Sequence, residues 1–368
     1  QFYKICEVTA SSSCNGQVLK RTVTDTSGFY GSFNVLFADG MSAYLLSSST
    51  SYFFKVELST MGSQYINQYQ GTMSGGFAEG DYLYALPESS ISNVLRTINA
   101  SFSYPATSEL THSLSNVAGG FSDGTYGYLV PSSGGQLGRF NLQTFAMDPS
   151  TPTDLTSVHS DLSSFSGGFH DGTYGYLVPD KDGVLSASGR VVRFNLASFS
   201  GFEVLDVSNN GAFSARQQFI DGFTDFSYGF LIAGGFGRTK AIVRFSLSDF
   251  TLASVEEATV SLISSGSFVR GLRRVRYGYI FNDDGAVIKF HLKTLEQERL
   301  EAVASNVWAA FLDASGTFWM ASTANSYKDF YSLCQDSLPF VNVHITCNST
   351  AEKLTVTDES IDWVSMTF

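Results

Sequence analysis

The stretch AGGFSDGTYGYLVP at residues 118–131 recurs almost unchanged as SGGFHDGTYGYLVP at residues 166–179. Each copy is followed by an arginine-containing segment, GRFNLQTF at 138–145 and VRFNLASF at 192–199. Near-identity over so many positions indicates an internal repeat. Weaker copies align on the residue that follows the glycine pair, which gives seven anchors: Phe37, Phe77, Phe121, Phe169, Phe223, Leu272 and Phe311.

The spacing of these anchors predicts the fold class. Successive anchors are 39 to 54 residues apart, and no apolar period of 3.6 residues runs through the units. Each unit divides into four short strands. The first ends at the anchor and an acid, and an Asp-Gly turn joins it to the second, which carries alternating aromatics. The third ends in Arg-Phe-Asn-Leu, and the fourth is variable. We therefore expect an all-β, seven-bladed β-propeller of four-stranded antiparallel blades.

The ends of the repeat array predict how the ring closes. Residues 17–24 precede the first anchor as a fourth strand would, and the seventh unit ends after its third strand near Leu333. An N-terminal strand that completes the last blade leaves no open sheet edge. We expect an N-terminal segment at 1–16, the propeller at 17–334, and a C-terminal tail at 335–368 on or near the closure seam.

Residues 17–334 resemble the β-propeller superfamily at large. The seventh unit, with Asp313-Ala-Ser-Gly-Thr-Phe-Trp319, is similar to the Asp-x-x-Gly-x-x-Trp hairpin of several propeller families. This resemblance implies the ring fold. The consensus points to no specific characterised family, so it assigns no catalytic residues.

The composition of the chain limits the classes of partner that it is expected to bind. The formal net charge is −12, and no Lys/Arg-rich run is present, so the chain repels a phosphate backbone and nucleic acid is not expected as a partner. No stretch approaches 18 consecutive apolar residues, so no membrane span is expected. Hydrophobic residues make up 43% of the chain, enough to form a large core. The sequence does not specify an oligomeric state.

Cysteines and sequons predict a secreted, extracellular protein. The cysteines form two close pairs, and we expect disulfides, either between neighbours or between the termini; the spacings do not fit zinc, and only His344 lies near. Asn99-Ala-Ser and Asn348-Ser-Thr are glycan acceptor sequons, and a first residue Gln1 is consistent with signal-peptide removal. The cysteines are Cys6, Cys14, Cys334 and Cys347.

No local motif indicates catalysis or a cofactor. The sequence has no nucleophile elbow, no phosphate-binding loop and no histidine pair at metal-ligand spacing, so no metal and no cofactor are expected. The sequence does not exclude a site assembled from several blades at the central channel.

Departures from the repeat give the candidate ligand-binding residues, because a scaffold needs the shared positions and function is added by changes. The first glycine of the pair becomes Asp221 in the fifth unit and Arg270 in the sixth, at the expected channel mouth. The pair could bind a ligand or form a structural ion pair at the rim. His170 stands where neighbouring units have Ser or Thr, directly after the anchor. It could bind a ligand or simply pack in the scaffold.

The sixth unit gathers arginines within an acidic chain. Arg270, Arg273, Arg274 and Arg276 fall within seven residues, where they could clamp a carboxylate or sulfate, or face solvent and neighbouring acids. In the seventh unit, Trp308 and Trp319 could stack on a sugar ring or pack between blades.

Two recurring columns are expected to belong to the scaffold, capping turns or pairing within blades. The acids at the first turn are Asp39, Glu79, Asp123, Asp171, Asp225 and Asp313. The bases of the third strand are Lys55, Arg96, Arg139, Arg193, Arg244 and Lys289.

Three functions fit this sequence. The favoured one is a secreted recognition propeller that binds a glycan or an extracellular protein through the variable loops 131–138, 179–190 and 233–240. The alternatives are an extracellular enzyme, of polysaccharide lyase or hydrolase type, that uses Asp221 and Arg270, and a structural module of a matrix or filament.

Overall fold

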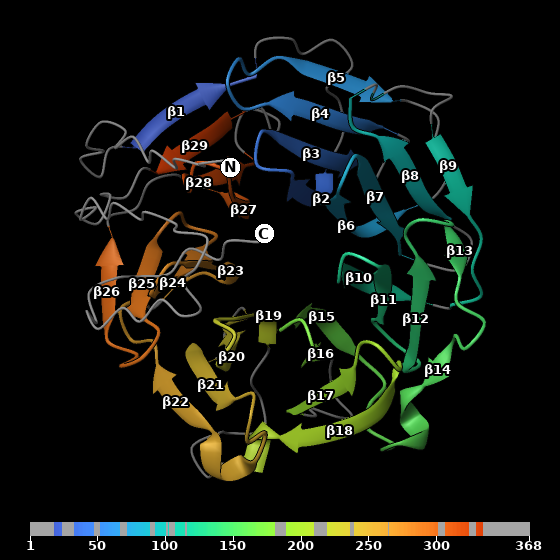
Figure 1. The fold of residues 1–368 in the computed structure, drawn as a ribbon. Helices are drawn as coiled ribbons and strands as arrows, with labels where there is room; N and C mark the ends of the chain where they lie inside the picture. Colours follow the sequence, from blue (N-terminus) through green and yellow to red (C-terminus); the bar gives the residue numbers. More distant parts are fainter. Residues whose placement is uncertain are drawn as a thin grey trace, which may run out of the picture.

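A computed structural model shows seven β-sheets arranged as the blades of a ring (Figure 1). The strands of each blade are lettered A to D from the ring centre outward, and a few short 3₁₀ turns are the other regular elements. The predicted all-β, seven-bladed propeller is confirmed. The structure describes residues 18–23, 33–47, 52–66, 72–88, 93–100, 102, 107–114, 116–180, 189–209, 219–235, 239–263, 265–300, 306–323 and 329–333.

The first three blades follow one another along the chain. Blade 1 comprises β2 (Phe33–Ala38), β3 (Ser42–Ser47), β4 (Phe53–Glu57) and β5 (Ser63–Ile66). Blade 2 comprises β6 (Met73–Glu79), β7 (Tyr82–Pro87), β8 (Val94–Ile98) and β9 (Thr107–Leu110). Blade 3 comprises β10 (Val117–Ser122), β11 (Tyr126–Pro131), β12 (Gln136–Asn141), β13 (Ala146–Met147) and the short β14 (Thr153–Asp154), which also pairs with β12.

The remaining blades continue around the ring. Blade 4 comprises β15 (Phe165–His170), β16 (Tyr174–Pro179), β17 (Arg190–Asn195) and β18 (Ser200–Asp206). Blade 5 comprises β19 (Phe219–Thr224), β20 (Tyr228–Ala233), β21 (Ala241–Ser246) and β22 (Glu256–Thr259). Blade 6 comprises β23 (Phe268–Arg274), β24 (Tyr277–Asn282), β25 (Val287–His291) and β26 (Gln297–Leu300).

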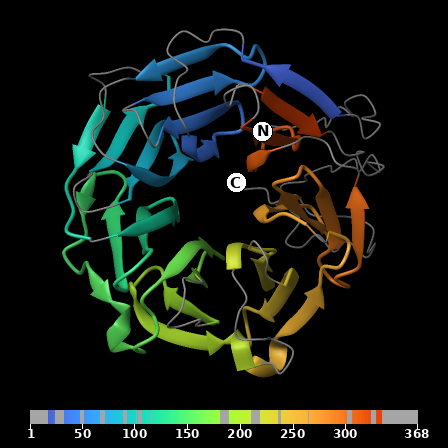
Figure 2. The same ribbon diagram turned by 180° about the vertical axis from the view of Figure 1, so that it is seen from behind.

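Blade 7 closes the ring with strands from both ends of the propeller. Its strands A to C are β27 (Val307–Leu312), β28 (Phe318–Ser322) and β29 (Asp329–Leu333), and its outer strand is β1 (Val18–Thr22). β1 lies antiparallel to β29, with Thr22 opposite Asp329, and the two views of the ring show them side by side (Figure 2). The predicted closure by an N-terminal strand is confirmed.

The seam is also held by polar contacts. Asp329 is buried, accepts a hydrogen bond from Thr22 Oγ1 at 2.6 Å, and pairs with Lys20 Nζ at 2.7 Å. The segments 1–16 and 335–368, the four cysteines and Asn348 lie outside the described residues, so the domain limits, the disulfides and that glycan site stay predictions.

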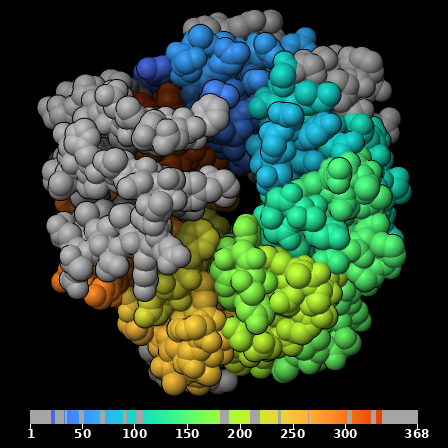
Figure 3. All heavy atoms as spheres, in the orientation of Figure 1, coloured from blue at the N-terminus to red at the C-terminus, as the bar shows by residue number. Residues whose placement is uncertain are grey.

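The glycine-glycine-phenylalanine motif explains how neighbouring blades pack. The Phe121 ring stacks on Tyr128 of its own blade, with centroids 4.8 Å apart, and also lies against Gly168 of the next blade. A Cβ atom added at Gly168 would be 2.7 Å from that ring, so the second glycine is needed where the preceding anchor crosses. Blades 2 to 5 accordingly lie in contact with one another around the ring in the space-filling view (Figure 3).

The glycine between the strand-B aromatics has a second role. Gly175 pairs across the sheet with Phe194, whose ring would be 2.5 Å from a Cβ atom at that position. Gly127 and Gly229 sit opposite Phe140 and Phe245 in the same way. In blades 3 to 6 the ring of a strand-C phenylalanine therefore covers a strand-B glycine, a cross-strand pairing that stabilises glycine in a sheet.

The strand order defines two faces of the ring. Because the strands of a blade are antiparallel and consecutive, the A–B and C–D connections lie at one end, here called the turn face, and the B–C and D–A connections lie at the other, the loop face. Strand A runs between the faces along the channel side, and each strand A has a β-bulge near its loop-face end.

The glycine pair gives a test of this packing. Gly168→Ala places a methyl group 2.7 Å from both the Phe121 ring and the Tyr176 carbonyl oxygen, so the free energy of unfolding should fall by about 1–3 kcal/mol. Gly167→Ala meets no atom within 4 Å and should change stability by less than about 0.5 kcal/mol. Urea denaturation of both variants measures the difference; equal effects would contradict the packing role of the second glycine.

Candidate functional site

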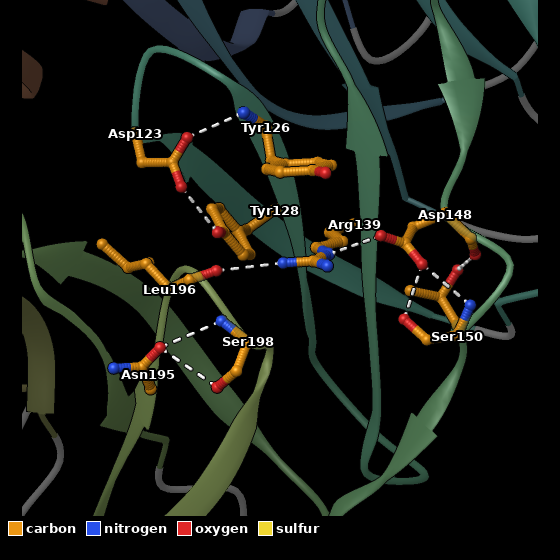
Figure 4. A network of polar contacts seen from close by, with 10 residues as sticks. Asp123, Tyr126, Tyr128, Arg139, Asp148, Ser150, Asn195, Leu196 and Ser198 are labelled. Atoms are coloured by element: carbon orange, nitrogen blue, oxygen red, sulfur yellow. Dashed lines mark hydrogen bonds and ion pairs between the residues drawn. The ribbon is translucent and has the colours of Figure 1, made fainter.

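The aspartates that recur at the A–B turns accept hydrogen bonds from backbone amides of their own turns. Asp123 Oδ1 accepts from the backbone amides of Thr125 and Tyr126, and Oδ2 accepts from the Tyr128 hydroxyl at 2.7 Å (Figure 4). Burial, followed by the hydrogen bond to Asp123, raises the pKa of Tyr128 well above its usual range. Asp171 makes the same contacts in blade 4. These carboxylates have the structural role that the sequence predicted.

The recurring strand-C arginines connect each blade to the next. Arg139 Nη1 donates to the carbonyl oxygen of Leu196 in blade 4 at 3.0 Å, and its Nε donates to Asp148 in its own blade at 2.8 Å (Figure 4). Its guanidinium lies between the rings of Tyr126 and Phe199, 4.1 and 4.4 Å from their centroids. Arg96, Arg193 and Arg244 reach Leu142, Leu247 and Leu292 likewise.

Asp221 and Arg270 meet at the loop-face end of the inner ring. Arg270 Nε lies 3.2 Å from Asp221 Oδ2, and the same oxygen accepts from the backbone amide of Gly271 at 3.0 Å. Asp221 Oδ1 accepts from the amide of Gly222 at 2.9 Å. The Asp221 side chain is 15% exposed and that of Arg270 is 52% exposed, so the acid clasps blade 5 to blade 6 while the guanidinium borders solvent.

The turn face of blades 5 and 6 carries residues that the sequence analysis missed. Phe226 and Val275 occupy the turn position that holds Gly124 in blade 3 and Gly172 in blade 4. Both side chains are exposed, 60% and 40%, and both residues have positive φ, 72° and 55°. Bulky residues at positive φ also occur at the C–D turns, for example Phe199, but that side chain is buried. The loss of the repeat glycine at these two positions is the sequence signal that could have identified them.

Arg273 joins these two turns. Its Nη1 donates to the Thr224 carbonyl oxygen and its Nε to the Val275 carbonyl oxygen, both at 3.3 Å, and its guanidinium lies 5.4 Å from the centre of the Phe226 ring. Arg273 is therefore on the opposite face from the Asp221–Arg270 pair. The four neighbouring arginines of the sequence do not form one cluster, because strand A carries Arg270 and Arg273 towards different ends of the channel.

The other predicted ligand-binding residues lie apart from this pair. His170 stacks on Phe121, with centroids 6.1 Å apart, and its Nδ1 accepts from the Gly172 amide. Trp308 lies half-buried in the bulge of β27 and packs against the core shared by blades 7 and 1. Trp319 is buried, and its Nε1 donates to Asp313 at 2.8 Å, as the tyrosine hydroxyls do elsewhere. Ligand binding by His170 and Trp308 stays a prediction.

Asn99 is engaged where blades 1 and 2 meet. Its Nδ2 donates to Asp39 at 2.6 Å, and its Oδ1 accepts from the Tyr44 hydroxyl at 2.6 Å and from Lys55 Nζ at 3.0 Å. Modification of this amide by a glycan stays a prediction, and it would compete with these contacts.

The described residues were also searched for hollows, metal sites and membrane-spanning helices. A hollow of about 260 Å³ on the turn face lies between blades 3 and 4, lined by Asp123, Thr125, Tyr126, Gly172, Leu196 and Ala197. Among the described residues, no group of three or more His, Cys, Asp or Glu side chains is arranged to hold a metal ion. A search of the same residues finds no helix of sufficient length and apolar character to cross a membrane.

Comparisons with known proteins define the class by fold. No protein-family model matches the chain, and no curated protein matches it. Among solved structures, the chain is similar to hydrazine synthase of Kuenenia stuttgartiensis, with a TM-score of 0.59 and 12% identity over 79% of this chain and 92% of that one. It is also similar to U3-55K, with a TM-score of 0.62 and 10% identity over 86% and 98%. This likeness supports the seven-bladed β-propeller architecture.

Removal of a strand-C arginine tests its role between blades. Arg139→Gln deletes a buried guanidinium and leaves Asp148 and the Leu196 carbonyl without it, so we expect a loss of about 3 kcal/mol in unfolding free energy. Arg299→Gln removes an exposed guanidinium with one bond to the Leu262 carbonyl and should cost less than about 0.5 kcal/mol. Chemical denaturation compares the two; similar losses would refute the inter-blade role.

We expect the two members of the Asp221–Arg270 pair to contribute unequally to the stability of the fold. Asp221→Ala leaves the amides of Gly222 and Gly271 without their acceptor and should destabilise the fold by about 1–3 kcal/mol. Arg270→Ala removes a half-exposed side chain and should change stability by less than about 0.5 kcal/mol. Thermal unfolding of both variants measures this, and an Asp221→Ala protein as stable as wild type would exclude the clasp.

Proposed function

We propose that this chain is a secreted, extracellular recognition propeller that binds a glycan or protein ligand without transforming it. One observation carries the proposal: exposed apolar side chains, Phe226 and Val275, replace glycine at the inner turns of two adjacent blades. Exposed apolar groups at special backbone positions favour contact with a partner.

The use of the shared polar groups supports this interpretation. The turn acids bind their own amides, and the strand-C arginines bind carbonyl groups of the next blade. Because these recurring residues hold the scaffold, ligand contacts are left to the positions that differ between blades.

The enzyme alternative depends on Asp221. A general base needs a carboxylate oxygen within reach of a substrate proton. In this chain, Asp221 Oδ1 accepts from one amide, and Oδ2 accepts from another amide and faces Arg270. That set of contacts favours a structural role over proton transfer.

The location of the ligand surface has two candidates. The predicted loops 131–138, 179–190 and 233–240 belong to the loop face, but 181–188 and 236–238 lie outside the described residues. The apolar departures of blades 5 and 6 favour the turn face. Secretion is supported by the four cysteines, which occur as two close pairs in the sequence, and by the two sequons.

A combined binding and turnover screen tests the function. The full chain, produced through a secretory pathway, is applied to an array of extracellular glycans and proteins, and each spot is then analysed for cleaved or unsaturated products by mass spectrometry. We expect retention on a defined subset and no product. Any product formed at a catalytic rate, and lost in Asp221→Ala, would replace the recognition proposal with the enzyme alternative.

A further inference from the structure

The inner A–B turns of blades 5, 6, 7 and 1 join into one continuous strip on the turn face, here called the turn arc. Arg273 bridges the turns of blades 5 and 6 through Thr224 and Val275. The Arg274 side chain lies against blade 7, because a Cβ atom at Gly316 would be 3.2 Å from its Nε. The Ala314 amide donates to the Gly40 carbonyl oxygen of blade 1 at 2.9 Å, which completes the strip.

The turn arc is apolar at three points along its length. Phe226 in blade 5, Val275 in blade 6 and Met41 in blade 1 are 60%, 40% and 71% exposed. The corresponding turns of blades 2, 3 and 4 carry the pairs Gly80-Asp81, Gly124-Thr125 and Gly172-Thr173. One half of the turn face therefore presents apolar side chains to solvent and the other half presents small or polar ones, an asymmetry typical of an interaction surface.

Backbone conformation adds an independent observation. Gly124 and Gly172 have φ of 86° and 92°, values that glycine adopts freely, whereas Phe226 and Val275 have φ of 72° and 55°. A side chain at positive φ lowers folding stability, and glycine at the same turn is available in the other repeats. Phe199 at a C–D turn also has positive φ, but its side chain is buried and contributes to the core. Phe226 and Val275 have the same conformation with exposed side chains, which favours a role outside the fold.

The charge of the turn arc indicates the charge of the partner. Arg273 lies in the turn arc of a chain whose net charge is −12, and its guanidinium donates to the carbonyl oxygens of Thr224 and Val275 rather than to a carboxylate. The nearby carboxylates of Asp225 and Asp313 accept from amides of their own turns. A surface that combines an arginine with an aromatic ring and aliphatic side chains has the composition of a binding hot spot and complements negative charge.

We infer that the turn arc docks an acidic segment of a partner protein that also carries aromatic or aliphatic side chains. This inference rests on the proposed recognition function and adds the surface and the chemistry of the ligand. A protein segment is favoured over a sulfated glycan, because Phe226, Val275 and Met41 need apolar groups to cover them and guanidinium groups pair with carboxylates as well as with sulfates.

The experiment uses a random library of 12-residue peptides displayed on phage and selected against the full chain. We expect enrichment of peptides with Asp or Glu next to aromatic or aliphatic residues. In the double variant Phe226→Gly with Val275→Gly, which restores the glycine of the other repeats, affinity for a selected synthetic peptide should fall by on the order of tenfold or more. The melting temperature of this variant should equal or exceed that of wild type.

Two further variants make the result specific. Thr125→Ala with Thr173→Ala alters, in blades 3 and 4, the turn position that Met41 occupies in blade 1, and should keep affinity within about twofold. Met41→Ser changes only an exposed side chain at the other end of the turn arc, and should weaken binding on the order of threefold even if the double glycine variant fails to fold.

Other outcomes overturn the inference. Selected peptides without acidic residues, or peptides whose affinity survives both the glycine variant and Met41→Ser, would exclude the turn arc as an acidic-segment site. Arc-dependent binding of heparin fragments in the absence of any selected peptide would assign the surface to a glycan instead. In each case the recognition function still stands if the array screen finds a ligand, and it falls separately if that screen finds product.

Discussion

A guanidinium group between two blades is the interaction on which the ring depends. Strand D of one blade ends, and strand A of the next begins, at the loop face, so another contact must fix the blades at the turn face. Arg96, Arg139, Arg193 and Arg244 supply it by donating to a leucine carbonyl in the next blade. Each guanidinium also lies over an aromatic ring of its own blade, which holds the planar group in place.

The closure seam keeps this contact with a residue from another strand. Strand C of blade 7 has Ser332 opposite Trp319, where the other blades have arginine or lysine opposite an aromatic. Arg21 of β1 donates to the Leu58 carbonyl oxygen of blade 1 at 3.2 Å, and it lies over Trp319. The N-terminal strand therefore completes the sheet and restores the inter-blade bond, so the ring can close without a special joint.

The sequence predicted what repeats and could not predict what the repeats contact in space. Seven recurring anchors determine the blade number and the closing strand, and the recurrence of the turn acids identifies them as structural. The arginines bind backbone carbonyls, which have no sequence signature. Arg270 and Arg273 are three positions apart in the sequence, which suggests one cluster, but the extended strand A carries them towards different ends of the channel. Phe226 and Val275 were visible as missing glycines, but Arg273 joins them only across a blade boundary.

The same division explains why the turns of blades 5 and 6 are free to differ. In blade 6 the turn has lost both its glycine and its acid, since Arg274 stands where Asp123 and Asp171 stand elsewhere. The β23–β24 hairpin nevertheless keeps its register up to Arg274 and Tyr277, because the inner strand is fixed by Phe223 and Ile232 of blade 5 packing on Gly271. When packing between blades sets the register, the turn tip is not needed for folding. Its residues can then be selected for what they contact outside the ring.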